Sequence, residues 1–518
     1  VGVLSRLSGL RGVCLTWGMT LWWLACQQSP APTPTPATGP APAGSPWAGS
    51  GACSSCHSGA TEAWRDSHHA LAQRELLAVD EAFGSGTSTM PDGSAVSGVL
   101  GLDPLRQYLV PAERGRVQVH ASAWDVERGE WFDVFGDGRE PGEWGHWTGR
   151  GMTWNTRCAG CHNTGFTAGY DRRTDTYDSR MEEQGVACEA CHGPAQAHVD
   201  GGPPPPIPSM EVCGSCHSVR VPLTAEPDVH LPMLDQFLPQ IPDLTEAYYA
   251  DGRVRDEDFE YVAFLTSAMA QADVTCIDCH EGHSGALRHD GDALCNQCHG
   301  PDGRKPAAAH DQHEGQVACV DCHMPLTTYM QRHPRRDHGL FIPDPRTAAE
   351  VGRDSVCAGC HEDRGEPWIE AAFVNYWGED RRGRGALARA LYTARSGDTT
   401  AVPELLAATA EKHPMWRAIA AGALEIAADQ PEVVAVLAEL TEDADPWVRL
   451  SAAHALGASQ DRSALRARLT DPRLAVRVAA QRGLRPDLDP GTAPVRDYEN
   501  MLALSSDQPS SRAERGAW

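Results

Sequence analysis

The chain has 518 residues, and its net charge of −26, from 70 acidic and 44 basic residues, argues against nucleic acid as a partner, since phosphates are bound by Lys and Arg. The length is sufficient for two or three domains. Eighteen cysteines are typical of a disulfide-rich secreted protein, but sixteen of them fall in pairs separated by two residues, and histidine follows every such pair.

The N-terminus, residues 1–26, predicts an export signal. Arg6 and Arg11 precede an apolar run over residues 13–26, which is too short for a comfortable transmembrane helix and is typical of a signal peptide. Cys26, preceded by alanine and followed by polar glutamines, resembles the cleavage site of a bacterial lipoprotein. Lipidation of Cys26, simple cleavage, and retention of the segment as an anchor stay open as alternatives.

Residues 27–50 predict a linker, and residues 51–378 a domain that carries all the cysteine pairs. The linker is rich in proline, which prevents helix formation, so we expect an extended tether. The segments between the pairs are short and rich in Gly and Pro, as in 201–209. Such segments cannot supply an ordinary apolar core, and we expect a bound group to supply most of it.

Residues 100–157 contain no cysteine and predict a small antiparallel β meander inside this domain. Apolar and polar residues alternate over 116–124 and 130–135, and the tripeptides at 113–115 and 127–129 are typical of turns. We interpret the meander as a packing element, with a docking surface for a partner as the alternative.

From residue 384 the sequence changes to alanine-rich segments with helical periodicity and no cysteine. The segments 443–457 and 469–484 align on Asp-Pro, Val-Arg and Ala-Ala, and 412–427 is a weaker copy. A period of about 30 residues with paired helices is typical of HEAT repeats, which stack into a solenoid. We therefore expect a HEAT-like solenoid over 384–490 and a tail over 491–518.

The eight cysteine pairs all have the form C-x-x-C-H, which predicts covalently bound c-type haem. Two thiols at this spacing form thioethers with the two vinyl groups of a haem, and the histidine that follows binds the iron. Zinc does not require histidine directly after every pair, and a thioredoxin-type pair would not be repeated eight times. The predicted haem-attaching residues are Cys53, Cys56, Cys158, Cys161, Cys188, Cys191, Cys213, Cys216, Cys276, Cys279, Cys295, Cys298, Cys319, Cys322, Cys357 and Cys360. The predicted proximal ligands are His57, His162, His192, His217, His280, His299, His323 and His361.

The second axial position of each iron decides between electron transfer and substrate chemistry. The haem region holds twelve further histidines, enough to close all eight irons. His198 lies too close to its own motif to reach round that haem, so we expect it to bind a neighbouring one, and the same argument applies to His283. The predicted second ligands are His68, His69, His146, His198, His230, His283, His310, His313 and His338. Solvated loop histidines are the alternative for each of them, and they are the preferred interpretation for His120, His289 and His333.

Eight haems within about 310 residues cannot avoid lying close together, and a contiguous series of iron centres moves electrons from ring to ring. The sequence therefore predicts an electron carrier. Covalent haem attachment of this type takes place outside the cytoplasm, in agreement with the export signal, so we expect the periplasm, the outer membrane or the cell surface.

Several phrases outside the motifs resemble a known family. "CSSCHSGATEAWRDSHHALA", "HWTGRGMTWNTRCAGCHNTG", "GVACEACHGPAQAHV", "VTCIDCHEGHSG" and "RRDHGLFIPDP" are similar to the exported multihaem cytochromes c with cytochrome c-554-like haem clusters and a C-terminal HEAT or TPR region. The resemblance covers roughly residues 51–490. It implies a mainly α fold with much irregular structure and bis-histidine ligation of many irons. The expected fold class is thus a multihaem cytochrome c domain with a small β insertion, followed by an α-solenoid.

Two functions stay open. The first is a non-catalytic conduit between redox partners, such as other cytochromes or a membrane quinol-linked donor. The second is an oxidoreductase of nitrite, hydroxylamine or sulfite, which needs one iron with an open position flanked by acid–base or cationic groups. Histidine sufficient for every iron favours the conduit, and no catalytic residue is identified, although Tyr170 and Tyr177 lie near the second motif. The HEAT-like repeats add a surface for protein docking.

Overall fold

The structure is a computed structural model. It describes residues 44–76, 82–83, 89–136, 138–171, 173–225, 227–256, 259–300, 312–313, 316–378 and 384–484. The chain divides into Val1–Thr35 and Pro36–Trp518, and every described residue belongs to the second unit. The predicted export signal with Cys26 and the predicted tail therefore lie outside the described residues. Within the described part, no helix is long and apolar enough to cross a membrane.

Short helices and turns carry the C-x-x-C-H motifs. Helical geometry brings residues three apart onto one face, which places the two thiols of a motif side by side. Helices of this length are marginal on their own, so the surrounding loops must hold them in place. The motif elements are α1 (Ser50–Cys53), α4 (Ala159–His162), α5 (Cys188–His192), α7 (Met210–Gly214), α9 (Cys276–Cys279), α10 (Ala293–His299), α11 (Cys319–His323) and the 3-10 turn η5 (Val356–Gly359).

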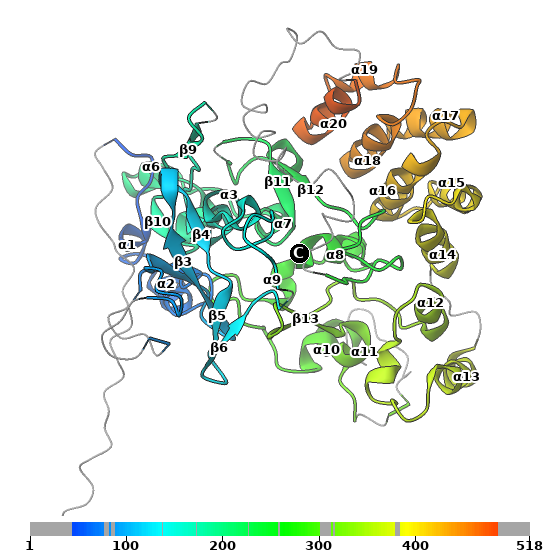
Figure 1. Ribbon diagram of the computed structural model, residues 1–518, viewed down its shortest axis with the longest axis horizontal. Coiled ribbons are helices and arrows are strands. Elements are labelled where there is room, and N and C mark those ends of the chain that lie inside the picture. Colours follow the sequence, from blue (N-terminus) through cyan, green and yellow to red (C-terminus); the bar gives the residue numbers. More distant parts are fainter. Residues whose placement is uncertain are drawn as a thin grey trace, which may run out of the picture. The chain divides into compact units, whose positions relative to one another are not determined.

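The remaining elements of this region are equally short (Figure 1). The helices are α2 (Ser58–Arg65), α3 (Trp154–Arg157), α6 (Gln196–Val199), α8 (Glu260–Leu265) and α12 (Pro345–Glu350). Two-stranded sheets pair β7 (Asn163–Thr164) with β10 (Glu183–Gln184), β8 (Tyr170–Asp171) with β9 (Thr176–Tyr177), β11 (Arg220–Pro222) with β12 (Phe237–Pro239), and β13 (Leu326–Tyr329) with β14 (His333–Arg336). Such a set of elements agrees with the expected fold class, mainly α with much irregular structure.

An antiparallel sheet of six strands, drawn in blue to cyan in Figure 1, forms the predicted β insertion. Its order is β1-β2-β3-β5-β6, with β4 also paired to β3. The strands are β1 (Gln73–Arg74), β2 (Gly98–Leu100), β3 (Leu105–Pro111), β4 (Val117–Val119), β5 (Ser122–Asp125) and β6 (Glu130–Asp133). Strand β1 thus precedes the predicted range 100–157, and β2 ends at its first residue. The side chain of Tyr108 is completely buried in the apolar cluster on this sheet.

The alternating run 116–124 forms two strands, β4 and β5, although the sequence predicts one. The interruption lies at His120, whose ring is buried. The His120 Nδ1 atom accepts a hydrogen bond of 2.9 Å from the Ser122 amide, and its Nε2 atom lies 3.2 Å from an oxygen of Asp92. Because the Ser122 amide donates to this side chain, it cannot also donate to a neighbouring strand, and the chain bends here.

Helices α14 to α20, in yellow to red in Figure 1, form the predicted solenoid, and α13 directly precedes it. Helices α16, α18 and α20 contact one another in sequence, and α17 packs on α18. Proline stands in the first turn of α15, α16, α17 and α18, where its missing amide hydrogen costs nothing. The bounds are α13 (Glu366–Trp377), α14 (Gly385–Ala394), α15 (Val402–Ala408), α16 (Pro414–Ala423), α17 (Pro431–Leu440), α18 (Pro446–Leu456), α19 (Leu465–Arg468) and α20 (Leu474–Leu484).

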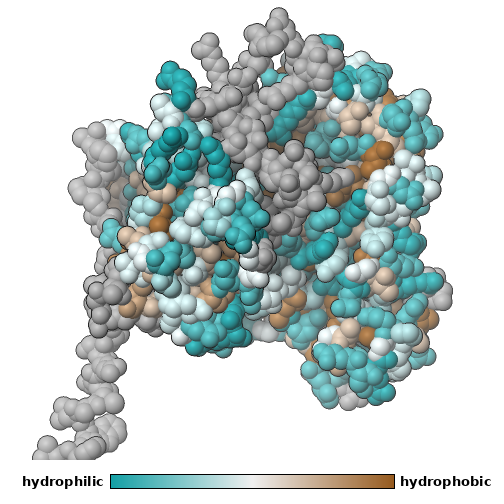
Figure 2. Space-filling model, viewed as in Figure 1, coloured by the Kyte–Doolittle hydropathy of each residue, from teal (hydrophilic) through white to brown (hydrophobic). Residues whose placement is uncertain are grey.

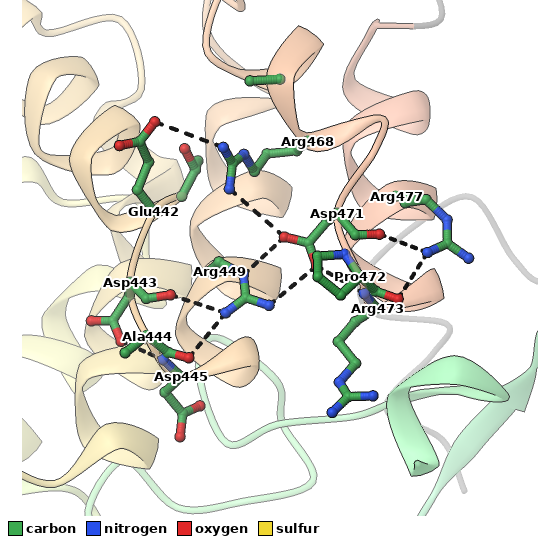
Figure 3. Close-up of polar contacts among 12 residues, drawn as sticks. Glu442, Asp443, Ala444, Asp445, Arg449, Arg468, Asp471, Pro472, Arg473 and Arg477 are labelled. Carbon is green, nitrogen blue, oxygen red and sulfur yellow. Dashed lines mark hydrogen bonds and ion pairs between the residues drawn. The ribbon is translucent and has the colours of Figure 1, made fainter. Parts of the chain in front are cut away.

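Arginine–aspartate pairs join successive repeats (Figure 3). The Arg449 guanidinium contacts Asp471 at 2.9 and 3.1 Å, and its Nη1 atom donates to the carbonyl oxygens of Asp443 and Ala444. One repeat earlier, Arg417 pairs with Asp443 at 3.0 Å. An arginine at the same position of each repeat therefore bonds to backbone carbonyls of its own repeat and to an aspartate of the next repeat.

The largest apolar core lies in the solenoid and in the wall of the haem region beside it, which includes Phe237 and Val262. Trp416, 1% exposed, donates through Nε1 to the carbonyl oxygen of Thr266 at 3.0 Å. The five smaller clusters contain between three and six buried residues each. On the face shown in Figure 2, hydrophilic and intermediate residues cover most of the coloured surface. The motif-bearing segments thus have little apolar core of their own, as the sequence predicts.

Candidate haem centres

Three motif histidines donate a ring hydrogen to a backbone carbonyl. The Nδ1 atoms of His162, His280 and His323 lie 3.0, 3.1 and 2.8 Å from the carbonyl oxygens of Ala72, Gly285 and Phe341. A carbonyl oxygen only accepts hydrogen bonds, so Nδ1 carries the hydrogen and Nε2 keeps its lone pair. This is the arrangement that fixes a metal-binding imidazole.

Four motif histidines face a histidine from outside the motifs. The motif member of each pair comes with its cysteines on a short helix or turn, and the other member comes from a distant loop or helix end. The pairs, with the distances between ring centres, are His57 with His198 at 6.4 Å, His217 with His69 at 6.2 Å, His280 with His338 at 6.5 Å, and His361 with His313 at 6.1 Å.

These distances fit one metal ion between the two rings. Nitrogen–metal bonds of imidazole are about 2.0–2.1 Å, and the centre of a five-membered ring lies roughly 1.1 Å behind its nitrogen. Two imidazoles on opposite sides of one ion therefore have their centres about 6.3 Å apart. All four pairs lie within a few tenths of an ångström of that value.

His192 has other imidazoles close to it. Burial lowers its pKa, and the nearby rings of His283, His57 and His230 lower it further. His230 lies against Gly193, where an added Cβ would stand 2.3 Å from Nε2 of that ring. Glycine at this position, with φ of 74°, is therefore what lets His230 approach the motif.

Two further histidines that the sequence predicts as second ligands, His68 and His146, contact other side chains. His68 is 65% exposed, with Nε2 3.5 Å from an oxygen of Asp103. Nδ1 of His146 lies 2.8 Å from the Thr148 hydroxyl, and its ring centre is 6.1 Å from that of Trp147. His310 is outside the described residues. His299 lines the cavity described below.

Thiols of different motifs contact one another. Cys53 interacts with Cys188, Cys161 with Cys216, and Cys213 with Cys276. Burial raises the pKa of the Cys191 thiol to about 11, with smaller effects from Cys213 and Cys188. All sixteen motif cysteines are described, and none of them forms a disulfide. Neighbouring motifs therefore place their haem-attaching atoms next to each other.

A large cavity lies among the motifs. Its volume is about 3860 Å³, whereas a pocket for one small ligand is usually about 300–1,000 Å³. Both cysteines and the histidine of four motifs line it, those that begin at Cys158, Cys213, Cys276 and Cys295. A hollow of this size, surrounded by thiols and imidazoles, has room for several large flat groups. The residues present therefore fit haem.

Two buried carboxylates at the first and third motifs have no recognisable signal in the sequence. Glu189, between the cysteines of the third motif, accepts from the amides of Ala48 and Gly49 at 2.9 and 2.8 Å. Glu183 accepts from the amide and the hydroxyl of Ser50. Together they attach the start of the first motif to the third. Burial raises the pKa of Glu183, while the bonds from Ser50 oppose that shift.

Glu260 is a third residue that the sequence did not indicate. Its Oε2 atom lies 3.2 Å from Nδ1 of His217, where the three histidines above have a carbonyl oxygen. Burial alone would raise the pKa of Glu260, but the hydrogen bond to His217 and the nearby charges of His217, Arg335 and His338 bring it to about 2. A carboxylate therefore accompanies one motif imidazole.

Family models match three parts of the chain. "Cytochrome c554 and c-prime" matches residues 52–93, "cytochrome c7 and related cytochrome c" matches 145–218, and "HEAT repeats" match 367–457 and 402–485. The chain joins a multihaem cytochrome c region to C-terminal HEAT repeats. Covalently bound haem c and electron transfer, as the sequence predicts, are thereby confirmed for this multihaem cytochrome. The HEAT match begins ahead of the predicted boundary at 384 and takes in α13.

Solved structures resemble the multihaem cytochrome as well. One is the crystal structure of the outer cell wall cytochrome OcwA, whose sequence is 17% identical to this chain. The match covers 85% of this chain and 100% of the OcwA chain, with a TM-score of 0.50. The undecahaem cytochrome from the S-layer of Carboxydothermus ferrireducens is 17% identical, covers 75% and 70%, and has a TM-score of 0.39. No curated protein matches. The first likeness confirms the predicted fold class, a multihaem cytochrome fold.

Proposed function

We propose that this cytochrome is an exported electron conduit with eight covalently bound haems, one at each C-x-x-C-H motif. The sixteen motif cysteines would attach the haems, and the eight motif histidines would be the proximal ligands. A bound haem supplies one-electron chemistry between Fe(III) and Fe(II), at a potential that its axial ligands and its burial adjust. The observation that carries the proposal is the set of four facing imidazole pairs at 6.1–6.5 Å.

Each facing pair would close both axial positions of one iron. His198 would complete the site of His57, His69 that of His217, His338 that of His280, and His313 that of His361. An iron held in this way has no position left for a substrate, which favours electron transfer over catalysis. For His192, the neighbouring rings of His230 and His283 are the candidates, and His68, His146 and His310 remain candidates for the other motifs.

Contacts between motifs support a continuous series of haems. Cys53 contacts Cys188, Cys191 lies near Cys213, and Cys213 contacts Cys276, which joins the first, third, fourth and fifth motifs. The second motif joins the series at the fourth, through Cys161 and Cys216.

The later motifs continue the series. The Gln297 side chain donates to the carbonyl of Asp278 at 3.4 Å, which links the sixth motif to the fifth. The Cys319 amide donates to Asp292 at 2.8 Å, which links the seventh to the sixth. Helix α11 contacts η5, which carries the eighth. Electrons would therefore pass between neighbouring rings along the whole region.

The signal-like N-terminus and the outer cell wall location in the name of OcwA support a position in the periplasm or at the cell surface. Lipidation of Cys26 would anchor the chain there. The net charge of −26 favours redox partners with a basic docking patch. Other cytochromes or a membrane quinol-linked donor are the candidate partners, and the HEAT repeats offer a further docking surface.

Low-temperature EPR of the purified holoprotein tests the proposal, together with an intact-mass measurement that counts the haems. We expect a mass increase of eight haems and ferric low-spin signals that nitrite, hydroxylamine and sulfite leave unchanged. A smaller mass increase would refute the count, and a high-spin signal that changes with one of these compounds would refute the purely non-catalytic conduit.

Residues near the second motif in the sequence favour an oxidoreductase as the second candidate. Burial lowers the pKa of Arg157, directly before this motif, and raises that of nearby Tyr177 to about 12. A guanidinium and a phenol are groups that stabilise an oxyanion and supply a proton. If the EPR experiment shows a high-spin signal that responds to nitrite, hydroxylamine or sulfite, replacement of Arg157 by leucine should abolish the response.

A further inference from the structure

His217 has a different hydrogen-bond partner from the motif histidines that bond to carbonyl oxygens. Its Nδ1 atom lies 3.2 Å from the carboxylate of Glu260, whereas His162, His280 and His323 donate to backbone carbonyls. The contact is supported twice, because the amide of Tyr261, the next residue, donates to the carbonyl oxygen of His217 at 2.9 Å. Glu260 therefore cannot move away from His217 without the start of α8.

A carboxylate partner changes the donor strength of an imidazole. When the Nδ1 hydrogen is shared with an anion, electron density on the ring rises and Nε2 becomes a stronger ligand. A stronger ligand stabilises Fe(III) more than Fe(II), so the reduction potential falls. A neutral carbonyl oxygen accepts the same hydrogen with a smaller effect.

The same imidazole also takes part in the one crossed pair among the four. The rings of His69 and His217 are inclined at 74°, whereas the inclinations of the other three pairs are between 27° and 39°. Parallel imidazoles donate to the same iron d orbital and split it from its partner. Crossed imidazoles donate equally to both orbitals, which leaves them nearly equal in energy and makes the low-spin EPR signal strongly anisotropic.

We propose that Glu260 is a positioning residue which, through His217, lowers the reduction potential of the fourth-motif haem below what a carbonyl partner would give. This inference rests on the proposed ligation of one iron by His69 and His217. The crossed rings give that haem an EPR signal distinct from the signals of the other three pairs, so its potential can be followed separately from theirs in the intact protein.

The test is an EPR-monitored redox titration of the holoprotein with Glu260→Gln, Glu260→Asp and the control Glu425→Gln. Glutamine removes the charge, and aspartate keeps the charge but is too short to reach Nδ1. Glu425 also lines the cavity and contacts His454 at 3.8 Å, so its replacement reports the effect of losing a distant carboxylate.

We expect the midpoint of the strongly anisotropic signal to shift to more positive potential in both Glu260 variants, while Glu425→Gln leaves it unchanged. A shift in Glu260→Gln without one in Glu260→Asp would reduce the effect to charge alone and overturn the proposal. Equal midpoints in all four proteins would overturn it as well. Failure of the ligation itself is visible beforehand, since the wild type would then lack a strongly anisotropic low-spin signal.

Discussion

The imidazoles of His57 and His198 lie with their ring centres 6.4 Å apart, although one belongs to the first motif and the other follows the third. The three other facing pairs likewise join segments that are distant in the sequence. An iron bound between such rings would connect two parts of the chain. Ligation and folding of the haem region would therefore be coupled, as is usual for metal sites in proteins without a large core of their own.

Replacement of His198 by alanine should open one axial position. We expect one of the eight proposed irons to change from low spin to high spin, because the imidazole that faces His57 is lost. EPR and the optical spectrum of the ferric protein measure the change. His289, an exposed histidine that also lies in the haem region, supplies the control, and His289→Ala should leave the low-spin signals intact. Identical spectra for His198→Ala and the wild type would exclude His198 as a ligand.

Local patterns predicted much of the architecture. The C-x-x-C-H spacing locates eight possible attachment sites, because the chemistry acts within five consecutive residues. The aligned Asp-Pro and Val-Arg pairs predicted the HEAT repeats, since each repeat has the same local contacts. Alternation over 116–124 predicted strands, but not the break at His120, where the buried ring accepts from the Ser122 amide and lies against Asp92.

Contacts between distant segments were not accessible from the sequence. His68 and His69 are adjacent, and no local feature tells which one turns toward the haem region's interior. The structure pairs His69 with His217 and leaves His68 beside Asp103 at the surface. Glu260 is likewise an ordinary helix-start residue in the sequence, and only the packing of α8 brings it to His217.

Haem removal should unfold the region before α13 and spare the solenoid. The cavity of about 3860 Å³ would lose its contents, and the short motif helices would lose the contacts that hold them. The solenoid keeps its own apolar core, which includes Leu391, Trp416 and Leu437. Protein produced without haem attachment should therefore be cleaved by protease throughout 44–300, while a fragment within 384–484 survives. Mass spectrometry of the fragments, beside the holoprotein as control, decides this. Equal resistance of both regions would contradict it.

The Arg449–Asp471 pair should contribute more to the free energy of unfolding than an exposed ion pair among the described residues. The Asp471 side chain is completely buried and that of Arg449 is 12% exposed. Arg449→Met leaves the buried carboxylate without its main partner, which costs about 3–5 kcal/mol in the free energy of unfolding. Arg180 and Asp178 form an exposed pair, so Arg180→Met should cost about 0–1 kcal/mol. Denaturation followed by helical circular dichroism measures both, and similar values for the two variants would show that the Arg449–Asp471 pair is not a major source of stability.

Contact between the HEAT repeats and the haem region should weaken in acid through His413. Its ring is buried, Nε2 lies 3.1 Å from the Ser267 carbonyl, and Nδ1 has no hydrogen-bond partner. Burial lowers the pKa of His413, and the charges of Arg384 and Arg417 lower it further, against the Ser267 bond, which raises it. The folded protein therefore binds fewer protons at this site than the unfolded chain, in which a histidine has a pKa of about 6.5.

The contribution of His413 to the free energy of unfolding is therefore complete above about pH 6.5 and declines as the pH falls below that value. We expect the melting temperature of the wild type to drop more between about pH 7.5 and about pH 5.5 than that of His413→Asn, which has no proton to gain. His454 is 60% exposed and provides the control, since His454→Asn should follow the wild type. Parallel pH profiles for His413→Asn and the wild type would mean that His413 takes up its proton without disturbing this contact.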